Sequence, residues 1–380
     1  MSETVRQTVV SAPGKVILMG EHAAVYGHPA VVAAIDLRLT VTAARRDDDR
    51  ISIALPELEH SGVVTWNEII AFTDQARARW ERAFTSSEAD TNWTPEAGPP
   101  DRLVQLALGE TLVRCPQTPQ LGTGFKISSK LPLGSGFGSS AALAAGVANA
   151  YLGLTGVAEE PDAIQDIAHE VERRQHGTPS GVDHNAVIRG GLLWAHRDGD
   201  GELVLEPIRN RSPLLACLRL FHSGNPAEST GVLVAAVRER IQRAGKRFIR
   251  AIERIDQATH DLRKLLLGGE NEPSRLIALI RQSEAALEEL GVVPEPIRRI
   301  IRKIEAAGGA AKISGAGALT GEGGGSILVY HPEPEHIAGW DFLRSWLPLP
   351  VRLGTEGLRS EARPSDSSGR PITPSGPAES

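Results

Sequence analysis

The apolar positions first recur with the spacing of β-strands. Between residues 5 and 45, runs of Val, Ile and Leu are broken by Pro13-Gly14 and by Gly27-His28-Pro29. This pattern predicts several strands, with the first glycine-lysine turn between two of them. Shorter apolar stretches predict further strands at 123–129, 192–196, 203–206, 215–222, 310–314, 326–330 and 349–353.

Helical spacing dominates other parts of the chain. Apolar residues recur every three or four positions at 66–86, 101–115, 161–174 and 230–267, which predicts helices there, with a loop around residues 90–100. The stretch from Ala141 to Leu154 is apolar on nearly all sides, so we expect a buried helix. Residues 360–380 carry too little apolar surface to offset chain entropy, and we expect a disordered tail. The chain is thus of the α+β class.

Composition narrows the function classes. A chain of 380 residues is long enough for two domains around a cleft. The 41 Lys and Arg against 47 Asp and Glu give a net charge of −6, which argues against a nucleic-acid partner. A small anionic ligand chelated to a metal is still compatible with this net charge, because binding it needs only a local cationic pocket.

The two cysteines and the distribution of apolar residues bear on the compartment. Cys115 and Cys217 lie far apart and lack the spacing of a zinc site or a disulfide framework, so we interpret them as reduced thiols. No stretch reaches the ~18 apolar residues of a spanning helix, and the first ten residues lack the pattern of a signal peptide. We therefore expect a cytoplasmic protein without a membrane partner.

A glycine-rich segment precedes the predicted buried helix. Glycines let the backbone approach an anion, and the helix start adds unpaired N–H groups, so the context favours phosphate binding. A Walker A loop is excluded because Gly138, not Lys, precedes Ser139. A dinucleotide-binding loop is a weaker alternative, because Ser139 replaces its third glycine. Glu159 lies at a plausible distance for the acid that would bind the ribose, but no strand precedes it. A plain strand-to-helix turn also stays open. The candidate residues are Gly134, Ser135, Gly136, Phe137, Gly138, Ser139 and Ser140.

Two more segments place charged groups near turns. Lys15, Glu21 and His22 lie within one short stretch, where strand alternation would direct Lys15 to an apolar side that favours an anionic partner. Glu172 ends a predicted helix and Asp183 follows the turn after it, an arrangement that suits a Mg²⁺ ligand and a general base. Taken singly, each of these residues is equally well explained as a solvated, structural or helix-capping group.

Taken together and in this order, the three segments resemble the motifs of the GHMP kinase superfamily, and within it most closely the mevalonate kinases. The segments 12–22 and 176–183 carry most of this resemblance, and 312–317 resembles the third motif. The resemblance implies a ribosomal-protein-like N-terminal nucleotide-binding and catalytic domain, which we expect over 1–210. It also implies a ferredoxin-like C-terminal domain, expected over 211–359, before the tail at 360–380.

The resemblance also implies roles for single residues. Asp183 would be the catalytic base, with Lys15 between it and the transferred phosphate. Segment 134–140, with Gly315 and Gly317, would bind ATP. Ser140 and Glu172 would hold Mg²⁺, while the acceptor alcohol would contact Glu21, His22 and Thr230. The implied partners are MgATP and mevalonate or a similar small alcohol, and the resemblance is also compatible with a homodimer.

The third motif departs from the family pattern. Residues 318–323 intervene before Gly324-Gly325-Ser326, where relatives run a compact glycine cluster. Because of this insertion, the phosphorylated alcohol could be another compound, such as phosphomevalonate. The related ATP-dependent decarboxylase is disfavoured by Lys15, Glu21 and His22, and a regulator without turnover is disfavoured by the intact set of Lys15, Glu172 and Asp183.

Overall fold

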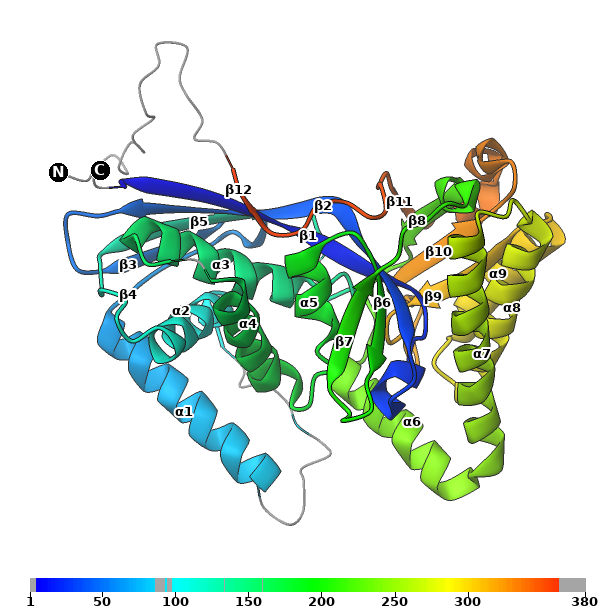
Figure 1. Cartoon of the computed structure of the whole chain (residues 1–380), viewed down its shortest axis with the longest axis horizontal. Coiled ribbons are helices and arrows are strands. Elements are labelled where there is room, and N and C mark those ends of the chain that lie inside the picture. The colour runs from blue at the N-terminus through cyan, green and yellow to red at the C-terminus, as the bar shows by residue number, and fades with distance from the viewer. Residues whose placement is uncertain (1–4, 86–92, 94–97, 133, 159, 362–380) are drawn as a thin grey trace, which may run out of the picture.

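The computed structural model describes residues 5–85, 93, 98–132, 134–158 and 160–361. Most of the loop expected at 90–100, and the expected tail from residue 362 onward, lie outside the described residues. Two β-sheets flanked by helices form the molecule and confirm the α+β class (Figure 1).

The larger sheet has eight strands among the described residues. Its strand order is β12-β1-β2-β5-β3-β4, with β6 pairing β2 and β7 pairing β6, and β3–β5 is its parallel pair. The strands are β1 Gln7–Met19, β2 Ala30–Arg45, β3 Ile51–Leu55, β4 His60–Val64, β5 Thr123–Ser129, β6 Leu192–Arg197, β7 Leu203–Pro207 and β12 Arg359–Ser360.

The predicted turn at Gly14-Lys15 is wrong, because β1 runs through it. The register between β1 and β2 shifts between Pro13 and Gly14, so the segment is a bulge inside a strand. A bulge accommodates a proline that has no N–H for the ladder. Gly14 is required for packing, since a Cβ there would lie 2.3 Å from the Leu131 side chain. The bulge therefore fixes the position of Lys15.

Five helices accompany the larger sheet. They are α1 Trp66–Thr85, α2 Arg102–Arg114, α3 Ser139–Thr155, α4 Pro161–His176 and α5 Val182–Arg189. Helix α3 packs directly on β1 and β2, with α2 and α4 beside it (Figure 1), and its burial on nearly every side confirms the prediction. The short α5 was not predicted, because Pro179 and Gly181 precede a segment with little apolar periodicity.

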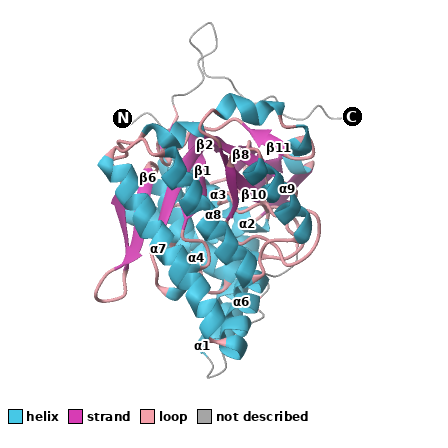
Figure 2. Cartoon of the chain, turned by 90° about the vertical axis from the view of Figure 1, so that its right-hand side faces the viewer, coloured by secondary structure: helices cyan, strands magenta, loops and turns pink. Residues whose placement is uncertain are grey.

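The second sheet has the order β11-β8-β10-β9 and is antiparallel. Figure 2, viewed from this end of the molecule, shows helices in front of its strands. The strands are β8 Leu218–His222, β9 Ala310–Ser314, β10 Ser326–Tyr330 and β11 Leu347–Leu349, and the helices are α6 Thr230–Ala244, α7 Lys246–Gly268, α8 Pro273–Leu290 and α9 Glu295–Ala306. Short 3-10 turns occupy Ala23–Tyr26, Pro56–Leu58, Pro213–Cys217, Pro334–Gly339 and Asp341–Leu343.

Three predictions in this half need correction. The single helix expected over 230–267 is two helices, because Gly245, with φ 35°, leaves the helical conformation between α6 and α7. The strand expected at 215–222 begins only at Leu218, after a 3-10 turn. The last predicted strand lies earlier, at β11, and Leu353 makes only an isolated bridge to Ile35.

Hydrogen bonds join the two sheets at the end of β1. The Ser314 hydroxyl on β9 donates to the Ile17 carbonyl at 2.9 Å and accepts from the Ile17 N–H at 3.0 Å. The strand that carries Lys15 is therefore attached to the second sheet. Among the described residues, no helix is both long and apolar enough to cross a membrane.

Candidate active site

Lys15 and Asp183 meet, as the sequence predicted. The Lys15 ammonium lies 2.9 Å from Asp183 Oδ1, and the side chains are 4% and 35% exposed. Lys15 comes from β1, while Asp183 sits in the first turn of α5, two residues after the left-handed Gly181. The lysine is enclosed by protein and the carboxylate is open on one side, so a reactant can reach Asp183.

The glycine loop is attached to this pair. Gly134, Gly136 and Gly138 all have positive φ, at 71°, 80° and 73°. The Lys15 N–H donates to the Phe137 carbonyl at 2.9 Å, and a Cβ on Gly138 would lie 3.0 Å from Lys15 Cγ. Gly138 is the N-cap of α3 and has no side chain, so the N-cap residue itself does not cap the first N–H groups of that helix. An anion would be stabilised there.

The glycines of the third motif, at 315–325, lie against the glycine loop 134–140. A Cβ on Gly136 would lie 3.6 Å from the Ser314 carbonyl, and one on Gly325 would lie 3.3 Å from the Ser135 carbonyl. The Ser135 hydroxyl also bonds Asn225 Oδ1 at 2.9 Å. Asn225 was not singled out from the sequence, because a lone Asn in a loop has no local signal. The two glycine segments thus lie next to each other, one from each half of the chain.

The inserted residues of the third motif are held in place by Glu228. Its carboxylate accepts from the Leu319 N–H at 3.0 Å and from the Thr320 hydroxyl at 2.6 Å. Gly317 is tightly packed, since a Cβ there would lie 2.1 Å from the Val292 carbonyl. Thr230, two residues after Glu228, is exposed at the first position of α6. Thr230 therefore lies close in sequence to the residue that anchors the insertion.

Glu21 has a partner that the sequence did not reveal. It forms an ion pair with Lys312 of β9, and both side chains are fully buried. Burial raises the pKa of Glu21, against the opposing effect of Lys312. The resemblance implied a substrate contact for Glu21, whereas in the structure its carboxylate is sealed in the protein and bonded to Lys312.

His22 connects the first motif to the third. Its backbone adopts φ 59°, which is uncommon outside glycine, and its Nε2 lies 2.9 Å from the Ala316 carbonyl. A carbonyl only accepts, so Nε2 carries the proton and donates. Burial lowers the pKa of His22, which favours the neutral ring. The strained backbone is thus stabilised by a contact between segments 294 residues apart.

Ser140 and Glu172 come from neighbouring helices. Ser140 is half-buried in the first turn of α3, and Glu172 is buried on α4. Glu172 Oε2 lies 2.6 Å from Nδ1 of His184, a residue that the sequence did not single out. No contact between Ser140 and Glu172 themselves is present in the described part of the chain.

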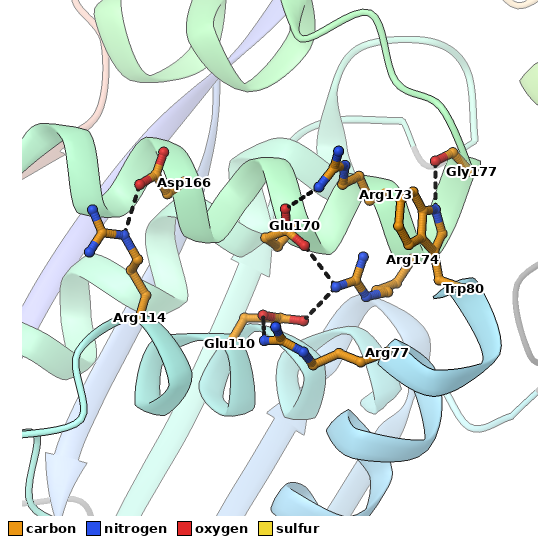
Figure 3. A network of polar contacts seen from close by, with 9 residues as sticks. All are labelled: Arg77, Trp80, Glu110, Arg114, Asp166, Glu170, Arg173, Arg174 and Gly177. Atoms are coloured by element: carbon orange, nitrogen blue, oxygen red, sulfur yellow. Dashed lines mark hydrogen bonds and ion pairs between the residues drawn. The ribbon is translucent and has the colours of Figure 1, made fainter. Parts of the chain in front are cut away.

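Helix α1 supports the turn that leads to Asp183. Figure 3 shows the Trp80 indole directed at Gly177, whose carbonyl accepts its N–H at 2.7 Å. Gly177 is left-handed at φ 77°, and a Cβ there would lie 2.6 Å from the Phe84 ring. Arg174 stacks over Trp80 and lies between Glu170, at 2.7 Å, and Glu110, at 3.6 Å (Figure 3). The start of the turn is therefore held by partly buried contacts that involve α1, α2 and α4.

The chain is similar in sequence to known proteins over most of its length. The sequence model of the GHMP kinases N terminal domain matches residues 104–191, which include the glycine loop and Asp183. The mevalonate kinase of Pyrococcus horikoshii is 28% identical over 362 residues, covering 94% of this chain and 98% of that protein. The human mevalonate kinase is 28% identical over 354 residues, covering 85% and 86%. Residues 104–191 therefore correspond to the N-terminal domain of the GHMP kinases, and most of the chain is similar to mevalonate kinases.

Solved structures of GHMP kinases share the fold of this chain. The mevalonate kinase of Methanococcus jannaschii superposes with a TM-score of 0.70 at 24% identity, covering 94% of this chain and 99% of that one. The galactokinase of Lactococcus lactis, solved with galactose, gives a TM-score of 0.66 at 17% identity, covering 94% and 96%. The two sheets described above are therefore those of the two-domain GHMP kinase fold.

Proposed function

We propose that this protein is a GHMP kinase that transfers the γ-phosphoryl group of ATP to the primary hydroxyl of mevalonate. Relatives that share most of its length are named mevalonate kinases. The observation that carries the proposal is the contact of 2.9 Å between Lys15 and the partly exposed Asp183, beside a glycine loop at the start of a helix. We further propose that residues 1–210 form the nucleotide-binding and catalytic domain and 211–359 the second domain.

In this proposal, Asp183 accepts the proton of the attacking hydroxyl. A general base needs a carboxylate that the substrate can reach, and the 35% exposed side chain of Asp183 meets that need. Lys15 keeps the carboxylate oriented and offsets the negative charge that develops on the transferred phosphoryl group. Because Lys15 is enclosed, its charge is poorly screened by water and acts strongly on its neighbours.

The proposed nucleotide site is the loop Gly134–Ser140 together with Gly315 and Gly317. Left-handed glycines turn successive N–H groups toward one side, and the start of α3 adds the positive end of a helix dipole. The absence of side chains at Gly136 and Gly315, which lie next to each other, allows phosphates to approach the backbone. These features fit a triphosphate.

For the metal, we propose Ser140 and Glu172 as ligands. A hydroxyl and a carboxylate are hard oxygen donors of the kind that Mg²⁺ prefers, and Glu172 Oε1 takes no hydrogen bond from the described residues. When bound, Mg²⁺ would neutralise phosphate charge. Ser140→Ala and Glu172→Ala should each raise the Mg²⁺ concentration needed for half-maximal rate, and an unchanged requirement would remove that residue from the ligand set.

We place the acceptor alcohol near His22 and the segment 316–320. His22 already donates to the Ala316 carbonyl, so its Nδ1 is left as an acceptor for a substrate hydroxyl. Glu21 would support the acceptor site indirectly, by holding Lys312 in place. Thr230 would contact the acceptor alcohol from the start of α6. The insertion held by Glu228 favours, as a second candidate, a larger or differently charged alcohol.

A single panel tests these assignments. ADP release is measured with mevalonate, phosphomevalonate, homoserine and galactose at equal concentration, with carbon dioxide release followed in parallel. We expect mevalonate to give the highest kcat/KM and no carbon dioxide. A higher kcat/KM with another alcohol would make that alcohol the acceptor in place of mevalonate. Release of carbon dioxide would favour the activity of the related decarboxylase. No ADP release with any alcohol would favour a nucleotide-binding regulator.

A further inference from the structure

His184 immediately follows Asp183 on α5 but points into the protein. It is 2% exposed, and its Nδ1 lies 2.6 Å from Oε2 of Glu172, which is also 2% exposed. The His169 ring, one turn before Glu172 on α4, lies 5.0 Å from the His184 ring between centroids. One short helix therefore delivers both the proposed base and a buried partner for the proposed metal ligand.

The neighbouring Asn185 fixes which nitrogen of His184 carries the proton. Asn185 Nδ2 donates to the Gly181 carbonyl at 2.9 Å, and a carbonyl cannot donate, so this atom is the amide nitrogen. The same Nδ2 lies 3.1 Å from His184 Nε2, which must therefore accept. The ring is then neutral with its proton on Nδ1, and that N–H donates to Glu172.

We propose that His184 is a positioning residue for Glu172. By occupying Oε2, it fixes the rotation of the carboxylate and leaves Oε1 as the oxygen that would face the metal. The chain of bonds runs from the Gly181 carbonyl through Asn185 and His184 to Glu172. It begins in the turn that carries Asp183, so base and metal ligand are set by one local structure. This inference rests on the proposed role of Glu172.

A different interpretation of the same cluster is a transition-metal site. Donor atoms of His169, Glu172 and His184 lie within 4.8 Å of one another, and two His with one carboxylate form a common ligand set. The hydrogen bonds oppose it, because one His184 nitrogen is protonated and the other accepts from Asn185. Binding of Zn²⁺ through Nε2 would displace Asn185, and binding through Nδ1 would remove the proton that Glu172 accepts.

The inference is tested with two substitutions of opposite prediction. His184→Asn keeps an N–H donor near the place of Nδ1, whereas His184→Leu keeps much of the volume and removes the donor. Loss of an outer partner of a metal ligand typically weakens metal affinity by about 10–100-fold. We therefore expect His184→Leu to weaken Mn²⁺ binding to the protein with a non-hydrolysable ATP analogue by that factor, measured by electron paramagnetic resonance. His184→Asn should stay within about threefold of wild type on the same reasoning.

The control is a second histidine–glutamate pair away from the site. His196 on β6 lies 3.3 Å from Glu206 on β7, and His196→Leu should leave Mn²⁺ affinity unchanged. Equal affinity in wild type and His184→Leu, or equal losses in His184→Leu and His184→Asn, would overturn the inference. Absence of Mn²⁺ binding with the nucleotide in wild type would do the same.

A readout in the wild-type protein covers the case in which His184→Leu does not fold. Nitrogen-15 NMR of the histidine rings should show His184 with its proton on Nδ1. A proton on Nε2, or stoichiometric Zn²⁺ binding that His169→Leu abolishes, would overturn the inference. Neither measurement depends on the acceptor alcohol. Failure of the mevalonate assay together with the expected Mn²⁺ result would reject the proposed function alone.

Discussion

Two lysine–carboxylate pairs are built from residues of the sequence motifs, but the two pairs differ in their surroundings. Lys15 meets Asp183 at 2.9 Å, and the carboxylate is 35% exposed. Lys312 meets Glu21, and both side chains are 0% exposed. The first pair is open to a reactant on the carboxylate side, while the second is closed to solvent. The same two chemical groups therefore suit proton transfer in one place and attachment of two sheets in the other.

The sealed pair helps to fix the geometry of the open one. Glu21 and His22 follow β1, which carries Lys15, and Lys312 lies on β9 of the second sheet. The Ser314 bonds to Ile17 and the His22 bond to Ala316 connect the same two segments. Because a buried ion pair is expensive unless both partners stay in place, its geometry is strongly restrained. We infer that the junction restrains the strand on which Lys15 lies.

The largest expected effect is on the open pair. Asp183→Asn keeps the shape but removes the proposed base, and general base catalysis contributes about 100- to 10,000-fold in rate. We expect ADP release with saturating ATP and mevalonate to fall by that factor, with ATP binding retained. Asp341→Asn, at a 79% exposed position, is the control. Turnover above one tenth of the wild-type rate would remove Asp183 from the role of base.

The sealed pair should respond in stability instead. Lys312→Met leaves the Glu21 carboxylate buried without its partner, which should lower the free energy of unfolding by about 3–5 kcal/mol. Urea denaturation measures it, with Lys264→Met, at a 67% exposed position, as the control. Adding Glu21→Gln should recover part of the loss. A loss below about 1 kcal/mol, the level of a surface pair, would show that the two pairs do not differ as we describe.

The pH dependence of stability should also come from the sealed region. Burial raises the pKa of Glu284 to about 8, and its Oε2 accepts from the Ile313 N–H at 3.0 Å. The folded state therefore holds a proton that the unfolded state releases above the ordinary pKa of 4.5. Stability from this group is present below that value and is lost as pH rises toward about 8.

Glu284→Gln should flatten this dependence. The wild-type free energy of unfolding should fall by up to about 1.4 kcal/mol per pH unit more steeply than that of the variant between pH 5 and 8. Urea titrations at several pH values measure the difference, and Glu295→Gln, at a 62% exposed position, is the control. Parallel curves for wild type and Glu284→Gln would contradict the prediction.

The smallest expected effect concerns the support of the open pair. Trp80→Phe keeps the ring but removes the N–H that the Gly177 carbonyl accepts, which should cost about 1 kcal/mol of stability. We also expect kcat to fall, because Gly177 begins the turn that leads to Asp183. Trp66→Phe loses a comparable bond, to the Leu121 carbonyl at 3.3 Å, and should lower the unfolding midpoint without affecting kcat. Equal effects of both variants on kcat would argue against positioning by Trp80.

The elements with strong local patterns were predicted well. The apolar α3 and the strands β5, β9 and β10 lie where the sequence placed them, because burial on all sides and short apolar runs are readable from the residues alone. Two of the errors fall where tertiary contacts override local signals or where an element is too short to carry them. Pro13-Gly14 reads as a turn until β2 pairs across it as a bulge, and α5 is too short to show a period.

Partnerships across the sequence were not predictable in the same way. The convergence of Lys15 with Asp183 was implied by the resemblance to the GHMP kinases, whereas Lys312 had no sequence signal as the partner of Glu21, 291 residues away. His184 and Asn225 are in the same position, since each acquires a meaning only from the side chain opposite it. No single-sequence periodicity encodes such pairs.

The sequence by itself determined the residue types that the chemistry needs, their order, and the glycines that allow a backbone to approach an anion. It also determined which segments had to be buried. Only the tertiary structure decided which lysine–carboxylate pair is open on its carboxylate side and which is sealed, because exposure depends on how two sheets meet. A charge acquires its function from the groups and the water around it, and those are set by packing between segments far apart in the chain.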